Sequence, residues 1–299
     1  MLEYNMHRLS EYERRVFHEI EVWNAPRYGM LSRAVEYVSD TPAFRWISEH
    51  VPPVPERIVR PVLRSIQGFL ELLKDGSYWT YSEQAIIRAA RRENLDVQRI
   101  EDLADKDLNA LDRVARSFFA ENKILSALEG AGTGLGGVIL IAADIPAVFT
   151  VALRAIQQVG ASYGFDMKDP NMTPIIMSVL GFASGAEEAA KIATLTDMQM
   201  AARMYARRWS YKKVAERTVI GGAANALKQA AKRMPQEIAN AITKKKLAQM
   251  LPLVGAAVGA GFNYWFISNT SRTAYMLFRE MYLARKYPNL WEEPKLSSA

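Results

Sequence analysis

The sequence predicts an all-α protein, a multi-helix bundle whose apolar helices are glycine-rich and tightly packed. Apolar residues recur at helical spacing along almost the whole chain, and no segment alternates apolar and polar residues well enough to be a strand. Two apolar blocks rich in glycine, 130–149 and 251–265, interrupt an otherwise charged sequence. Small residues four positions apart let two helix backbones approach closely. The blocks therefore predict either close helix packing or contact with lipid.

The first helix has a clear start and end. Ser10 and Glu13 have the spacing of a capping box, and Pro26 limits the helix at its far end. Between them, one side of the helix carries the apolar residues Val16, Phe17, Ile20 and Trp23. This pattern predicts an amphipathic helix that begins just after Ser10.

Later helices follow from the same periodicity and from turn residues. Helices are predicted over 58–73, 81–93 and 107–129, over a segment that starts at Thr173-Pro174, and from about 252 to 287. A turn-rich connector at 163–170 precedes Thr173, which is a plausible N-cap followed by proline. Since the sequence has no clean linker, we predict one helical domain. Its parts are an N-terminal helical subdomain (1–105), a glycine-rich helical core (106–290) and a flexible C-terminal tail (291–299).

The composition bounds the class of protein. With 49% hydrophobic and 23% charged residues, the 299-residue chain can bury a large core and is not disordered throughout. It has no cysteine, which excludes disulfides, thiolate metal sites and cysteine nucleophiles and fits a reducing cytoplasm. The first thirty residues lack the apolar core of a signal peptide, so we expect a cytoplasmic protein. Its net charge of +6 favours anionic partners, among them the inner face of the cell membrane.

Several motifs match known chemistry only in part. The segment 132–137 fits the dinucleotide fingerprint GxGxxG, but no strand precedes it and no phosphate-loop lysine follows. The three histidines do not form a helical metal-binding pair, so we expect neither a metal nor a cofactor. The segment 81–95 could pass for a DNA-binding helix, but the acidic stretch 101–107 would repel phosphates. We therefore expect no nucleic-acid partner.

The first glycine block leaves three alternatives open for the apolar stretch 134–153. It could be buried in protein as a kinked or broken helix, with Asp144 capping a new helix and Pro146 in its first turn. It could enter a membrane shallowly or reversibly, or it could span the bilayer. A carboxylate at the bilayer centre costs roughly 3 kcal/mol, which disfavours simple spanning.

Two groups of residues are candidates for function. The segment 203–213 combines basic and aromatic residues, as an anionic lipid surface requires, although charge runs are usually solvated helix faces. Its candidates for contact with lipid or another anionic partner are Arg203, Arg207, Arg208, Trp209, Lys212 and Lys213. Aromatic residues at 264–266 precede Arg272, a combination found at membrane interfaces and, more commonly, in cores. Asp144 and Asn263 would form a polar pair if the two glycine blocks pack together.

Several ordered motifs resemble the bacterial EcsC protein family across roughly residues 12–287. They are Tyr12-Glu13, Trp23, the run 129–137, Asp144-Ile-Pro146, Tyr163-Gly-Phe165 and the run 251–263. The resemblance implies a helical protein from a family whose namesake is encoded beside an ABC transporter and whose activity is poorly defined. It supplies no catalytic residues. The motif and core positions to follow in the structure are Gly130, Gly134, Gly137, Asp144, Pro146, Gly255, Gly259 and Asn263.

The expected function is that of a non-enzymatic helical protein that associates peripherally with the membrane or with a membrane transporter complex. Binding of acidic lipid would fit this function. Two alternatives stay open: a lipid-modifying or hydrolytic enzyme with Asp144 and Asn263 in an apolar pocket, and a soluble scaffold for protein interactions. The sequence does not specify a catalytic residue, a substrate or an oligomeric state.

Overall fold

The computed structural model describes residues 7–24, 80–122, 137–184, 255–288 and 290, and the single positions 60, 64, 68 and 203. Its α-helices are α2 (Glu11–Asn24), α6 (Glu83–Arg92), α7 (Leu108–Ser117), α9 (Gly137–Ser162), α10 (Thr173–Ser184) and α13 (Gly255–Lys286). Short 3₁₀ turns lie at Ile100–Leu103 and Pro170–Met172. These residues contain no strand, so the predicted all-α class is confirmed.

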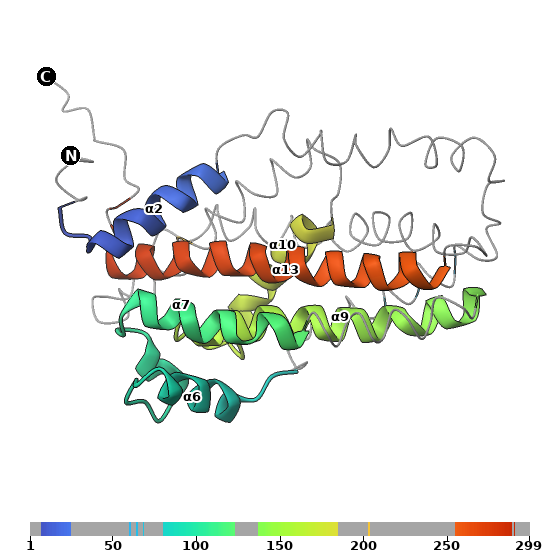
Figure 1. The fold of residues 1–299 in the computed structure, drawn as a ribbon, viewed down its shortest axis with the longest axis horizontal. Helices are drawn as coiled ribbons and strands as arrows, with labels where there is room; N and C mark the ends of the chain where they lie inside the picture. Colours follow the sequence, from blue (N-terminus) through green and yellow to red (C-terminus); the bar gives the residue numbers. More distant parts are fainter. Residues whose placement is uncertain are drawn as a thin grey trace, which may run out of the picture.

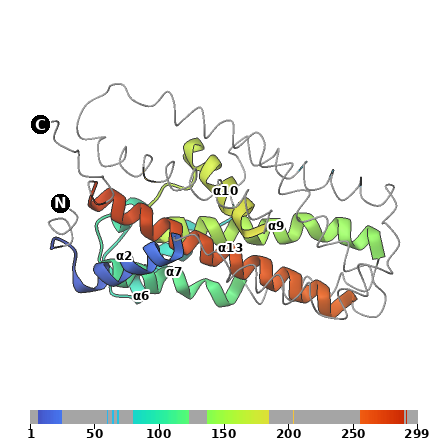
Figure 2. The ribbon, with the colours of Figure 1, turned by 90° about the horizontal axis from the view of Figure 1, so that it is seen from above.

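The two longest helices, α9 and α13, lie side by side and run in the same direction (Figures 1 and 2). The ring of Phe149 lies 5.8 Å from that of Phe266, and the ring of Tyr163 lies 6.4 Å from that of Tyr282. Residue numbers rise from the first contact to the second along both chain segments, so the two helices are parallel and in this register. The described parts of the two glycine blocks therefore start at the same end of the molecule.

The shorter helices gather around the other end of this pair. In Figure 1, α2 lies on one side of α13 and α7 on the other, with α6 beyond α7. α10 crosses the pair and packs mainly on α13 (Figure 2). The C-terminal half of α13 is thereby surrounded, and nearly every residue from Thr273 to Arg285 is buried.

The helix starts follow the predicted caps. Glu13 accepts a hydrogen bond from the Ser10 backbone N–H at 2.8 Å, and Ser10 Oγ accepts one from the Glu13 N–H at 3.1 Å, which confirms the capping box. α2 ends at Asn24, before Pro26, as expected. Asp107 caps α7, but this helix is interrupted by a turn at Phe118, short of the predicted continuous run to residue 129.

The alternative in which Asp144 caps a new helix is wrong. α9 is a single helix of 26 residues that passes through Asp144 and Pro146. Proline lacks an N–H, so the bond to the carbonyl four residues earlier is missing, but the helix continues on both sides of Pro146. The prediction for the last helix, by contrast, is confirmed by α13.

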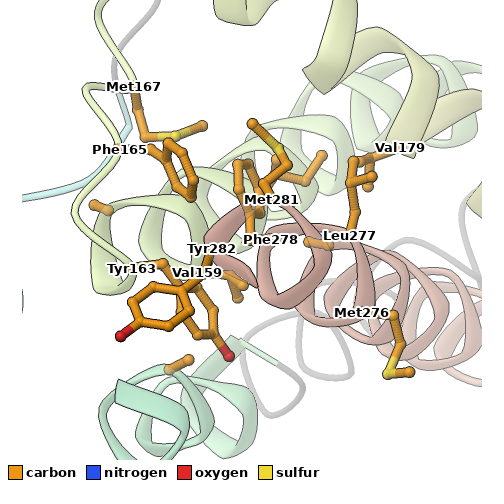
Figure 3. Packing of buried hydrophobic residues seen from close by; sticks show 14 of the residues in the cluster. Val159, Tyr163, Phe165, Met167, Val179, Met276, Leu277, Phe278, Met281 and Tyr282 are labelled. Carbon is orange, nitrogen blue, oxygen red and sulfur yellow. The ribbon is translucent and has the colours of Figure 1, made fainter. Parts of the chain in front are cut away.

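The core lies where α9, α10 and α13 meet the connector after α9 (Figure 3). Phe165 in the connector contacts Phe278 of α13, with ring centroids 5.6 Å apart. Met167, Val179, Met281 and other fully buried apolar side chains surround this pair. Each such side chain contributes roughly 1.5–3 kcal/mol by leaving water.

Within the described part of the chain, every helix is either too short or too polar to cross a bilayer. Three features stay predictions: the limits of the domain parts, the flexible tail after residue 290 and the close packing of glycines in the two blocks. Helix 58–73 and the segments 185–202 and 204–254 lie outside the described residues, apart from positions 60, 64 and 68.

Candidate functional site

A buried polar centre forms where α2, α7, α9 and α13 meet. Asp112 of α7 is completely buried, and its two carboxylate oxygens have different partners. Oδ1 accepts a hydrogen bond from the Tyr163 hydroxyl at 2.6 Å, and Oδ2 accepts one from the Tyr12 hydroxyl at 2.6 Å. Arg279 Nη2 lies 3.1 Å from Oδ2. Both oxygens are thus fully engaged inside the protein.

Arg279 connects this centre to the surface. Its guanidinium lies 4.6 Å above the ring of Tyr275, and Nη1 donates a hydrogen bond to Glu19 of α2 at 2.7 Å. Burial acts to lower the pKa of Arg279, but the Asp112 carboxylate beside it raises that pKa above its usual value. The arginine is therefore charged at every physiological pH and neutralises Asp112.

The tyrosines of the centre are held in their neutral form. Burial, the hydrogen bond to Asp112 and its negative charge raise the pKa of Tyr12 to about 12. Burial and the Asp112 charge raise the pKa of Tyr163 still further above its ordinary value. A neutral hydroxyl can donate to a carboxylate, so the centre is a stable hydrogen-bonded unit and not a source of phenolate.

Two further ionic groups join α2 to α13. Lys286 Nζ lies 2.7 Å from Glu13 Oε1, and the Tyr287 hydroxyl donates to Glu13 Oε2 at 3.0 Å. Glu280 is almost completely buried and accepts hydrogen bonds from Arg203 at 2.6 Å and from Asn24 at 3.1 Å. Burial raises the pKa of Glu280, and the Arg203 charge opposes this rise.

The ion pair at Glu13 predicts a loss of stability at acid pH. Burial acts to raise the pKa of Glu13, but the bonds from Lys286, Ser10 and Tyr287 outweigh it and lower that pKa below 4.5. A lowered folded-state pKa contributes stability above the unfolded value, and this contribution disappears as pH falls through the folded value. In urea titrations, Glu13→Gln should destabilise the protein at pH 7, and its difference from wild type should shrink below about pH 4.5. The exposed Glu11→Gln should show almost no difference at either pH.

A second feature is an aromatic–arginine surface on α13, made of Tyr264, Trp265 and Arg272. Among the described residues, the exposed large hydrophobic side chains are Val22 (49%), Tyr264 (49%) and Trp265 (37%). Trp265 and Arg272 are seven residues apart on α13, so they share one helix face about 10 Å apart. The exposed Arg272 lies 5.4 Å over the ring of Trp23, the neighbour of Val22.

This surface corrects the expectation that the aromatic run before Arg272 is core. Asn263 and Phe266 are completely buried, but Tyr264 and Trp265 between them are exposed. Adjacent residues of a helix are turned by about 100° from each other, so a helix with one buried and one exposed face does not bury four successive residues. The run therefore belongs to both the core and the surface.

Of the predicted motif and core positions, six lie in α9 and α13 and two lie outside the described residues. Gly137, Asp144 and Pro146 lie in the N-terminal half of α9, and Gly255, Gly259 and Asn263 lie in that of α13. The Phe149–Phe266 contact puts residues 144–146 level with 261–263 along the parallel helices. This register is compatible with the predicted pairing of Asp144 with Asn263, but a pocket at this level stays a prediction. Gly130 and Gly134 lie outside the described residues.

The basic candidates are only partly described. Arg203 is half-buried and pairs with Glu280. The other candidates lie outside the described residues: Arg207, Arg208, Trp209, Lys212 and Lys213. Contact of this segment with lipid stays a prediction. Across the described ranges, no three histidine, aspartate or glutamate side chains are grouped closely enough to hold a metal ion.

Sequence reasoning missed the buried polar centre itself. Asp112 and Arg279 each interrupt an apolar helix face, Asp112 beside Leu111 and Arg279 beside Phe278. A charged residue in that position is expensive to bury unless it is paired, so each could have been marked as one half of an ion pair. The partners could not have been named, since they are 167 positions apart by residue number.

The comparisons with known proteins agree with the predicted resemblance. The model of the EcsC protein family matches residues 14–283. The chain belongs to the EcsC protein family. This range contains Asp112, Tyr163 and Arg279, and also the aromatic–arginine surface, whereas Tyr12 and Lys286 lie just outside it.

Two curated relatives from Bacillus subtilis (strain 168) are similar over most of their lengths. Protein EcsC is 26% identical over 226 residues, which cover 75% of this chain and 79% of the relative. The uncharacterized protein YdbA is 25% identical over 228 residues, or 76% of this chain and 78% of the relative. No solved structure matches the chain.

Proposed function

We propose that this EcsC-family protein is a non-enzymatic helical protein that associates peripherally with an acidic membrane surface, on the cytoplasmic side. The observation that carries the proposal is the aromatic–arginine surface: Tyr264 and Trp265 are exposed on α13 about two turns before the exposed Arg272, whereas the following residues 273–285 are almost all buried. Tryptophan and tyrosine favour the headgroup region of a bilayer, where one end of the ring is apolar and the other is wet.

Charge supports the same partner. A basic residue near an anionic bilayer contributes about 1 kcal/mol, and the chain has a net charge of +6. Arg272 can reach phosphate groups while Trp265 occupies the interface below them. The basic candidates from Arg207 to Lys213 would add to this attraction, and a membrane protein complex at the same surface would be a natural neighbour.

The buried centre supports a non-enzymatic role. A catalytic carboxylate needs a free oxygen within reach of a substrate. Both oxygens of Asp112 are bonded to Tyr12, Tyr163 and Arg279, and its side chain has no exposed surface. We therefore assign the centre to structure: it holds α2, α7 and α9 on α13.

Co-flotation with liposomes tests the proposal. We expect the protein to float with vesicles that contain acidic phospholipid, to do so less at high salt, and to bind neutral vesicles weakly. The triple variant Tyr264→Ala/Trp265→Ala/Arg272→Gln should bind acidic vesicles at least tenfold more weakly, because it loses two interfacial rings and one charge, at about 1.4 kcal/mol per tenfold change.

A matched control is Arg92→Gln, which removes an exposed arginine from α6 and should alter binding far less. Circular dichroism would establish that the triple variant keeps its helices. Wild-type protein that stays at the bottom of the gradient at low salt, with every lipid composition, would overturn the proposal.

A further inference from the structure

α2 is an acidic helix that lies on a basic part of α13. α2 contains four glutamates and only two arginines, whereas α13 from Arg272 to Lys286 contains four basic residues and one glutamate. The two helices run in opposite directions, so that Glu13 meets Lys286 near one end and Trp23 meets Arg272 near the other. Two ion pairs, Glu13–Lys286 and Glu19–Arg279, therefore join the two helices.

Three cations of α13 are each occupied by a side chain of α2. Arg279 donates to Glu19 at 2.7 Å, Lys286 lies 2.7 Å from Glu13, and Arg272 lies over the ring of Trp23. We call Arg272, Arg279 and Lys286 the basic stripe. The fourth cation, Arg285, points inward, where it donates to the backbone carbonyls of Ala104 and Tyr163.

Two of the groups that α2 offers to the basic stripe, the carboxylates of Glu13 and Glu19, are chemically similar to the anions of an acidic bilayer surface. A glutamate carboxylate and a lipid phosphate are both anions that accept hydrogen bonds from guanidinium and ammonium groups. The stripe also continues directly into the aromatic–arginine surface, because Arg272 belongs to both.

The buried charges would keep partners if α2 left. Asp112 would retain Arg279 and the hydroxyl of Tyr163, and Glu280 would retain Arg203. An unpaired buried charge is what normally makes such a separation too costly. The Glu19 side chain is 58% exposed, so its bond to Arg279 already competes with water. Release is opposed by the burial of Val16, Phe17 and Ile20. It is also opposed by the hydrogen bond from Tyr12 to Asp112 and by the contact of Trp23 with Phe182.

We infer that α2 is a displaceable strap whose glutamates occupy Arg279 and Lys286 of the basic stripe, and that acidic phospholipid replaces these glutamates when the protein binds a membrane. This inference rests on the proposed function and adds an autoinhibitory contact to it. The strap lowers the affinity for acidic lipid, since anions of the bilayer must displace Glu19 from Arg279 and Glu13 from Lys286.

The sharpest test compares two substitutions in the same helix. Glu19→Gln weakens the bond to Arg279, while Glu21→Gln removes an exposed glutamate that forms no ion pair with the described residues. Both raise the net charge by one unit, so general attraction to the bilayer changes equally. We expect Glu19→Gln to bind acidic vesicles at least threefold more tightly than Glu21→Gln. Equal affinities of the two variants would overturn the strap.

Hydrogen exchange of the backbone amides of the wild-type protein is an independent test of whether α2 leaves α13. When acidic vesicles bind, the backbone amides of α2 should lose protection, while those of α6 and α7 keep theirs. Bound protein whose α2 stays fully protected would overturn the strap but leave the proposed function standing. If neither wild type nor Glu19→Gln binds acidic vesicles, the proposed function fails and the strap fails with it.

Discussion

The substitution Asp112→Ala is expected to lower the free energy of unfolding by about 3–5 kcal/mol, the typical cost of removing one partner of a buried ion pair. It leaves the buried guanidinium of Arg279 without its inner carboxylate and the buried hydroxyl of Tyr163 without an acceptor. Urea unfolding followed by circular dichroism would measure the change. The exposed Asp105→Ala, a few residues earlier in the chain, should change stability by about 0.5 kcal/mol or less.

A double-mutant cycle would separate the ion pair from the cavity that alanine leaves. Arg279→Met removes the charge that Asp112→Ala strands, so the double variant should be more stable than the sum of the two single losses implies. We expect a coupling free energy of about 1–3 kcal/mol. Strictly additive losses, or an Asp112→Ala variant as stable as Asp105→Ala, would contradict the role given to this pair.

The substitution Gly164→Ala should cost about 3 kcal/mol or more. Gly164 ends the turn after α9 with a φ of +76°, where a side chain adds roughly 1–2 kcal/mol of strain. A Cβ at this position would lie 2.5 Å from the backbone nitrogen of Ala104 and 2.8 Å from its Cα. Since backbone atoms cannot rotate away, overpacking adds about 1–3 kcal/mol. Thermal unfolding would show the loss as a lowered Tm.

Substitutions of two other glycines serve as comparisons for the loss of stability at Gly164. A Cβ on Gly160 would also be too close to its surroundings, the thioether of Met167 and Cζ of Phe278 at 2.7 Å. Both neighbours are side chains and the φ of Gly160 is not positive, so Gly160→Ala should cost less than Gly164→Ala. A Cβ on the helical Gly68 would meet no atom within 4 Å, so Gly68→Ala should be neutral or slightly stabilising. A Gly164→Ala protein as stable as Gly68→Ala would show that the close approach to Ala104 is not required.

Local signals in the sequence were sufficient to predict the helices. The Ser10–Glu13 capping box and the start of α10 at Thr173 depend on residues within one turn of each other, and both lie where the sequence predicts. The same kind of signal was misleading at Asp144, because aspartate before proline is typical of a helix start. Packing of α9 along α13 outweighed that local preference.

The candidate site could not be predicted in the same way. The Tyr12, Asp112 and Arg279 side chains meet only because four helices converge, and no periodicity encodes which helices are neighbours. The sequence did contain the aromatic residues before Arg272, but their division into buried Phe266 and exposed Trp265 depends on the angle at which α13 faces α9.

The contacts between α2 and α13 also determine an order of events during synthesis. The partners of Glu13, Glu19 and Asn24 follow 256–273 positions later in the chain. At about 5–20 residues per second, the ribosome takes on the order of 10–50 s to make that stretch. The first described helix must therefore wait for the last one before these bonds form, and until then the face of Val16, Phe17 and Ile20 lacks α13. During this interval the nascent chain carries an apolar helix face that a chaperone or a nearby bilayer could hold.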